Sequence, residues 1–128
     1  MMVYSTYCSN KKNRSSHLMP AFKRYQSKRI SAIHRTCLTQ NIPLLILSGK
    51  FGLIKANEPI YYYNYLLKPE DIEEHSNKVA EQLKKLGVQD LVFFTIPIEK
   101  DNKIISYIEC MKIACRIAEV KFKLVNLN

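Results

Sequence analysis

Residues 43–53 of this 128-residue chain read Pro43-Leu44-Leu45-Ile46-Leu47-Ser48-Gly49-Lys50-Phe51-Gly52-Leu53. A short aliphatic run without polar alternation predicts a strand that is buried on both faces. The Ser-Gly-Lys-Phe-Gly turn then leaves the carboxyl end of that strand, which is the edge where open α/β sheets bind ligands. We therefore expect Ser48, Gly49, Lys50 and Gly52 to bind an anion through backbone N–H groups and the lysine ammonium. We expect backbone shape, meaning positive φ or very close approach, to require glycine at positions 49 and 52.

Other apolar segments of similar length alternate with helical patterns along the chain. Strands that alternate with helices imply right-handed crossovers, and hence one three-layer, Rossmann-like α/β domain over residues 1–128 with a mainly parallel sheet of about four strands. The predicted strands are 2–7, 43–48, 90–96 and 121–127, and the predicted helices are 20–40, 69–86 and about 102–118.

Three loops follow the first three predicted strands: 8–20, 49–68 and 97–102. Parallel strands end at the same edge of the sheet, so we expect these loops to approach one another there. The second loop is about twenty residues long, and loops of that length in compact domains are usually functional or mobile.

Basic residues are concentrated in the first half of the chain. Residues 1–57 contain ten Lys and Arg and no Asp or Glu. Residues 58–128 contain ten Lys and Arg and eleven Asp and Glu. This asymmetry favours an anionic partner, either a nucleic acid or a nucleotide-like ligand. The alternative is an ordinary solvated basic surface.

The sequence shows no signature of a metal site, a nucleotide cofactor or a membrane location. The four cysteines form no C-x-x-C pair, so no metal site is expected. Neither a Walker A loop nor a G-x-G-x-x-G motif is present, so no nucleotide cofactor is expected. No leader peptide or membrane-length apolar run is found, and a cytoplasmic protein with reduced thiols is predicted.

Candidate catalytic residues follow the first strand, in Cys8-Ser9-Asn10-Lys11-Lys12. Cys8 is a candidate nucleophile because positive neighbours favour the reactive thiolate, although a small residue packed at a strand end is the alternative. Tyrosines at 61, 62, 63 and 65 suit stacking on bases next to cationic groups, and covering the sheet edge is the alternative for them.

These motifs resemble a family of small, mostly uncharacterised prokaryotic domains. The resemblance covers roughly the first 67 residues. The L-S-G-x-[YF]-G-L element is also similar to that of YaaA-type peroxide-stress proteins and of the core domain of archaeosine synthase, a transfer-RNA base-modifying enzyme with a Cys-x-x-x-Lys motif. The matching positions are Cys8-Ser9-x-x-Lys12, Pro20-Ala21, Arg24-Tyr25, Leu47 to Leu53, Glu58-Pro59-Ile60 and Tyr62-Tyr63-Asn64-x-Leu66-Leu67.

The resemblance implies a role directed at a nucleobase or a nucleic acid, with a fold akin to uracil-DNA glycosylases. It makes Lys12 a second candidate nucleophile and places Ser9, Arg24, Tyr62, Tyr63 and Asn64 among the ligand-binding residues. Two departures stand out. Asn13-Arg14 replaces the Pro-Tyr that follows the lysine in the archaeosine enzyme. Asn64 replaces the family's acidic residue, which removes a candidate general base.

Two hypotheses follow for the function. In the first, the protein is an enzyme acting on a nucleobase or nucleoside, with Cys8 or Lys12 as nucleophile. In the second, it is a non-catalytic nucleic-acid-binding module whose basic half follows phosphates without sequence specificity. A compact pocket joining Cys8, Lys12 and Ser48 would favour the enzyme, and an open basic groove would favour the module.

Overall fold

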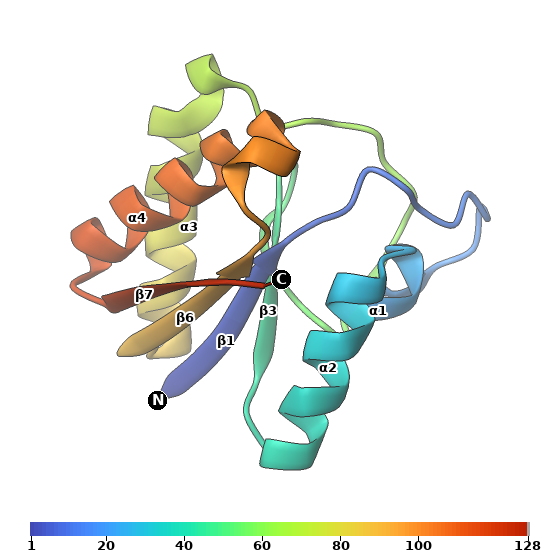
Figure 1. Ribbon diagram of the computed structural model, residues 1–128, viewed down its shortest axis with the longest axis horizontal. Coiled ribbons are helices and arrows are strands. Elements are labelled where there is room, and N and C mark those ends of the chain that lie inside the picture. Colours follow the sequence, from blue (N-terminus) through green and yellow to red (C-terminus); the bar gives the residue numbers. More distant parts are fainter. Residues whose placement is uncertain (128) are drawn as a thin grey trace.

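The computed structural model describes residues 1–127 and contains a five-stranded sheet between two helical layers (Figure 1). The sheet order is β4-β3-β1-β6-β7, and every neighbouring pair is parallel except β3 and β4. The α/β class and the mainly parallel sheet are confirmed. The strands are β1 (Met2–Tyr7), β2 (Met19–Pro20), β3 (Leu44–Ser48), β4 (Gly52–Lys55), β5 (Pro59–Ile60), β6 (Asp90–Thr95) and β7 (Lys121–Asn126).

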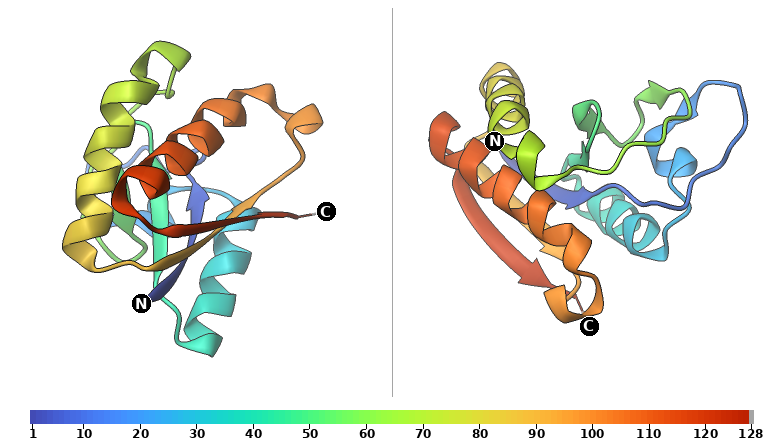
Figure 2. Two further views of the ribbon diagram at one scale, coloured as in Figure 1. Left: turned by 90° about the vertical axis from the view of Figure 1, so that its left-hand side faces the viewer. Right: turned by 90° about the horizontal axis from the view of Figure 1, so that it is seen from above.

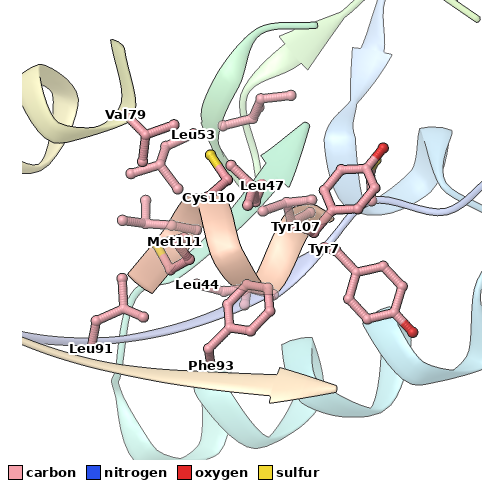
Figure 3. Close-up of a cluster of buried hydrophobic side chains, with 14 of the residues drawn as sticks. Tyr7, Leu44, Leu47, Leu53, Val79, Leu91, Phe93, Tyr107, Cys110 and Met111 are labelled. Atoms are coloured by element: carbon pink, nitrogen blue, oxygen red, sulfur yellow. The ribbon is translucent and has the colours of Figure 1, made fainter. Parts of the chain in front are cut away.

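Helices cover the two faces of the sheet unequally. Figure 2 (right) shows α3 and α4 together on one face and α2 alone on the other. The buried cluster between the sheet and the α3–α4 pair ends at Tyr7 and Tyr107, whose ring centroids are 6.0 Å apart (Figure 3). The helices are α1 (Ala21–Arg24), α2 (Lys28–Gln40), α3 (Ile72–Leu86) and α4 (Ile105–Ala118), with 3₁₀ turns at Pro69–Asp71, Ile98–Lys100 and Asn102–Ile104.

The predicted helix over residues 20–40 is wrong in one respect, because the chain breaks it after one turn. Tyr25 adopts an extended conformation and forms an isolated antiparallel bridge with Lys12. Ser27 then starts α2, and its hydroxyl accepts a hydrogen bond from the backbone N–H of Ile30 at 3.2 Å. A serine N-cap satisfies one of the free amides of a helix start. The break brings Tyr25 next to Lys12.

The twenty-residue loop predicted between residues 49 and 68 contains two strands. After the turn at Ser48, β4 returns along β3 as an antiparallel edge strand, pairing Ser48 with Gly52. Further on, β5 pairs with β2 from the loop that follows β1. Figure 2 (right) shows these two loop segments running alongside each other at one side of the molecule. The main sheet therefore has one strand more than predicted.

Helices in residues 1–127 are all too short or too polar to cross a membrane.

Candidate functional site

A pocket of about 250 Å³ lies at the carboxyl end of the central strand β1. Its wall combines residues of all three loops that were predicted to meet at this edge, and that prediction is confirmed. The lining residues are Tyr7, Cys8, Ser9, Asn10, Lys12, Arg29, Tyr65, Leu66, Asp101, Lys103, Ile104 and Tyr107. This volume lies below the roughly 300–1,000 Å³ typical of pockets for drug-sized ligands, so the pocket suits a smaller ligand or one group of a larger ligand.

Lys12 lies in this wall with only 9% of its surface exposed. Its Nζ is 4.7 Å from the ring centroid of Tyr63 and 5.9 Å from that of Tyr25. No carboxylate among residues 1–127 forms an ion pair with it. Burial therefore lowers the pKa of Lys12, because the charged form loses water without gaining a counter-ion, while the nearby Cys8 acts weakly in the opposite direction.

Three buried tyrosines surround the lysine and the cysteine. The hydroxyls of Tyr25 and Tyr63 are hydrogen-bonded to each other. Tyr107 contacts the Cys8 Sγ at 3.6 Å and accepts a hydrogen bond from the Leu67 backbone N–H at 3.1 Å. Burial raises the pKa of all three phenols above its ordinary value, so they remain protonated at neutral pH. The cluster thus offers neutral hydroxyls around one amine and one thiol.

Cys8 and Lys12 are the two predicted catalytic residues, and the structure brings both to this pocket together with Ser9. Ser9 faces the pocket, but its hydroxyl donates a hydrogen bond to the Lys11 carbonyl at 2.7 Å. Only 7% of Cys8 is exposed. The pair comes from one short loop because β1 ends at Tyr7 and the chain turns back at Lys12 to pair with Tyr25.

Ser48 and Lys50 do not share this pocket, so of the three residues expected to meet in an enzyme pocket only Cys8 and Lys12 do. Ser48 is fully buried, and its hydroxyl accepts hydrogen bonds from the backbone N–H groups of Lys50 and Phe51, both at 3.0 Å. Those two amides are already satisfied, so they do not form the anion cradle expected of this turn. Lys50 and Gly49 line a separate polar pocket of about 230 Å³ with His75.

The two glycines of the turn differ from each other. Gly52 has φ of +78°, the left-handed conformation expected for it, whereas Gly49 is not among the residues with positive φ. A Cβ on Gly49 would lie 2.9 Å from the Leu67 nitrogen and 3.0 Å from the Tyr107 hydroxyl. Close packing, rather than backbone conformation, therefore requires glycine at position 49, and this part of the expectation is corrected.

Arg24 is placed away from the pocket, although it was expected to bind a ligand. It is completely buried, and its guanidinium donates hydrogen bonds to four backbone carbonyls. The acceptors are the carbonyls of Asn13, Ser15, His17 and Ile60. The side chain thus fastens the loop after β1 to β5, and it supports the pocket wall without reaching it.

The tyrosines expected to stack on bases also differ in whether they line the pocket. Tyr63 is buried with the Lys12 ammonium over its ring, so that face is not open to a base. Tyr62 and Asn64 are exposed and do not line the pocket, whereas Tyr65 does. Its hydroxyl donates a hydrogen bond to Asp71 at 2.6 Å.

Sequence reasoning missed three residues that shape this site. Tyr25 was present in the resemblance motif but received no role. Arg29 was counted only as one of many basic residues. Tyr107 had no signal, because it belongs to α4, almost a hundred residues from Cys8. Comparisons of the chain with protein family models, curated proteins and solved structures returned no match.

Proposed function

We propose that this protein is an enzyme that acts on a nucleobase or nucleoside, with Lys12 as its nucleophile. The observation that carries the proposal is the environment of the Lys12 amine. It is mostly buried, has no carboxylate partner among residues 1–127, and lies near the Cys8 thiol in the wall of a small pocket. A lysine is activated as a nucleophile by desolvation or by cationic neighbours, since both favour the uncharged amine.

The chemistry follows from the groups around that amine. The lone pair of Lys12 forms a C–N bond with the sugar carbon that carries the base, the glycosidic bond breaks, and the base leaves with the bonding electrons and takes up a proton. The Lys12 nitrogen then loses a proton, and the C–O bond of the sugar ring opens to give an imine and a hydroxyl group. The Tyr107 hydroxyl, which contacts the Cys8 Sγ, is the adjacent proton donor. The resemblance of Cys8-Ser9-x-x-Lys12 to the archaeosine synthase motif supports the same ligand class.

The test combines an activity assay with detection of the adduct. Nucleosides and short single-stranded oligonucleotides are incubated with the protein, base release is followed by chromatography, and borohydride is added to trap an imine for mass spectrometry. We expect a trapped adduct on Lys12 that is lost in Lys12→Met. Lys11→Met is the matched control, because Lys11 is adjacent and exposed. An adduct that persists in Lys12→Met, or no reaction with any substrate of this class, would refute the proposal.

One observation favours the second candidate, a non-catalytic nucleic-acid-binding module. An open groove of about 740 Å³ runs along α1 and the first turns of α2, and three cations line it: Lys23, Lys28 and Arg35. Cations along a groove suit contacts with successive phosphates, which carry no sequence information. The groove does not include Cys8 or Lys12, so variants in the two sites separate the two functions.

A further inference from the structure

Arg29 is held rigidly in the wall of the pocket that contains Lys12. Its guanidinium carbon lies 3.6 Å from the centroid of the Tyr7 ring. Nη1 donates hydrogen bonds to the Thr6 hydroxyl at 2.5 Å and to the Tyr7 carbonyl at 2.8 Å, and Nη2 donates to the Cys8 carbonyl at 3.4 Å. These contacts fix both the plane and the direction of the guanidinium.

The same contacts leave one edge of the group free. Arginine has five N–H donors, and three are used here. The remaining two are Nε–H and one Nη2–H. Nε and Nη2 together are an edge of the guanidinium that can bind two oxygens of a carboxylate or phosphate. Neither of the two remaining N–H groups has an acceptor among residues 1–127, and Arg29 forms no ion pair there. A half-buried guanidinium with a free fork is therefore a preformed receptor for an oxyanion.

The rest of the pocket has the charge that such a ligand needs. Arg29 and Lys103 are two cationic side chains in its wall, in addition to the Lys12 amine, against one carboxylate, that of Asp101. One oxygen of Asp101 accepts a hydrogen bond from the Lys103 backbone N–H at 3.0 Å, so it is engaged in starting the turn before α4. Two cations, the held guanidinium of Arg29 and the exposed ammonium of Lys103, suit a phosphate dianion better than a carboxylate, which carries a single charge.

We infer that Arg29 and Lys103 form a subsite for the phosphate group of a nucleoside phosphate whose electrophilic carbon faces Lys12. This inference rests on the proposed function for the identity of the ligand, but the subsite itself depends only on Arg29 and Lys103. It makes Arg29 a specificity residue that distinguishes a phosphorylated ligand from a free nucleoside.

Binding of the four common nucleosides, their 5′-monophosphates and inorganic phosphate is measured by calorimetry. In parallel, the ¹⁵N-labelled arginine Nε–H signals are followed by NMR, with Arg29 assigned through Arg29→Lys. We expect at least one monophosphate to bind at least tenfold more tightly than its nucleoside, and phosphate to shift the Arg29 Nε–H signal. Arg29→Lys keeps the charge but loses the fork, so it should weaken monophosphate binding at least tenfold.

If Arg29→Lys does not fold, a second variant and its control test the inference. Lys103→Gln, at an exposed position, should weaken phosphate binding several-fold, whereas Lys112→Gln on the exposed side of α4 should not. Equal affinity for nucleosides and monophosphates, or phosphate binding unchanged in Arg29→Lys or Lys103→Gln, would overturn the inference. Lys12→Met separates this result from the proposed function, because it should abolish the adduct while phosphate still binds.

Discussion

At the scale of single residues, burial of the Lys12 amine is unfavourable for the stability of the fold. Lys12 loses water on burial without gaining a carboxylate, and a buried charge without a partner is costly. Active sites commonly keep such groups at the expense of stability. The lowered pKa of Lys12 and its destabilising effect therefore have the same cause.

We predict that Lys12→Met stabilises the protein by on the order of 1 kcal/mol, since methionine fills similar space without charge. The backbone bridge between Lys12 and Tyr25 is retained in this variant. Urea unfolding at pH 7 measures the change, with Lys11→Met as the control. A destabilised Lys12→Met would show that the ammonium has a stabilising partner.

Glycine at position 49 is required by its surroundings. In Gly49→Ala the new methyl would press on the Leu67 nitrogen and the Tyr107 hydroxyl, and the backbone can yield little. We expect a loss of about 1–3 kcal/mol. Gly87→Ala meets no atom within 4 Å but has φ of +71°, so it should lose only about 1 kcal/mol through backbone strain. Chemical denaturation measures the free energy of unfolding of both variants. A smaller loss in Gly49→Ala than in Gly87→Ala would contradict the packing argument.

His75 makes stability depend on pH. Its Nε2–H donates a hydrogen bond to the Ser48 carbonyl at 2.8 Å, and burial lowers its pKa, while that bond acts in the opposite direction. Because the folded protein binds this proton less readily than the unfolded chain, its contribution to stability is complete above the unfolded pKa of about 6.5. That contribution is lost as the pH falls below this value towards the folded pKa.

Thermal unfolding between pH 7.5 and pH 5 measures this dependence. We expect the wild type to lose more stability over this range than His75→Gln. His34, whose pKa burial also lowers, should leave a residual slope in the variant. Identical slopes for the two proteins would mean that His75 does not carry the effect.

At the scale of elements, the turn that follows β3 is secured from α3. The Gln82 side-chain oxygen accepts a hydrogen bond from the Leu53 backbone N–H at 2.7 Å, and its nitrogen lies 3.3 Å from the Phe51 carbonyl and 3.4 Å from the Leu53 carbonyl. An amide side chain thereby satisfies backbone groups at the edge strand β4, where unpaired groups would otherwise invite association with other chains.

Gln82→Ala should therefore cost about 1–2 kcal/mol, because the Leu53 N–H loses its acceptor. It should also increase hydrogen exchange at β4 relative to β3 and β1. Glu81→Ala on the same helix is the control, since Glu81 is exposed and its ion pair with Lys84 contributes little. If hydrogen exchange at the Leu53 amide is unchanged in Gln82→Ala, the Gln82 side chain does not secure β4.

At the scale of the whole molecule, the basic residues before Glu58 have divided roles. Lys12 and Arg24 are buried and Arg29 is half-buried, so none of the three belongs to an exposed cationic surface. The other seven are exposed: Lys11, Arg14, Lys23, Lys28, Arg35, Lys50 and Lys55. Three of these seven, Lys23, Lys28 and Arg35, line the groove along α1 and α2, and we expect a polyanion to meet the molecule there.

We predict that the protein is retained on heparin and on single-stranded DNA, and that retention falls steeply with salt because binding releases counter-ions. The double variant Lys28→Glu and Arg35→Glu should elute at clearly lower salt. Lys84→Glu with Lys112→Glu, which changes the net charge equally on the opposite helical layer, should elute closer to the wild type. Equal shifts for both pairs would show that net charge alone determines retention.

The amino-acid sequence by itself determined the order and type of the main elements, because aliphatic runs, helix caps and turn residues act over a few neighbouring positions. It likewise predicted that Cys8 and Lys12 follow the first strand, and the structure places that strand at the centre of the sheet. Only the tertiary structure placed Tyr25, Arg29 and Tyr107 around them, because their contacts join positions that are distant along the chain. The same holds for Arg24, whose burial depends on four carbonyls supplied by two loops. Local patterns specify backbone conformation, whereas the environment of a charged side chain depends on which segments fold against it.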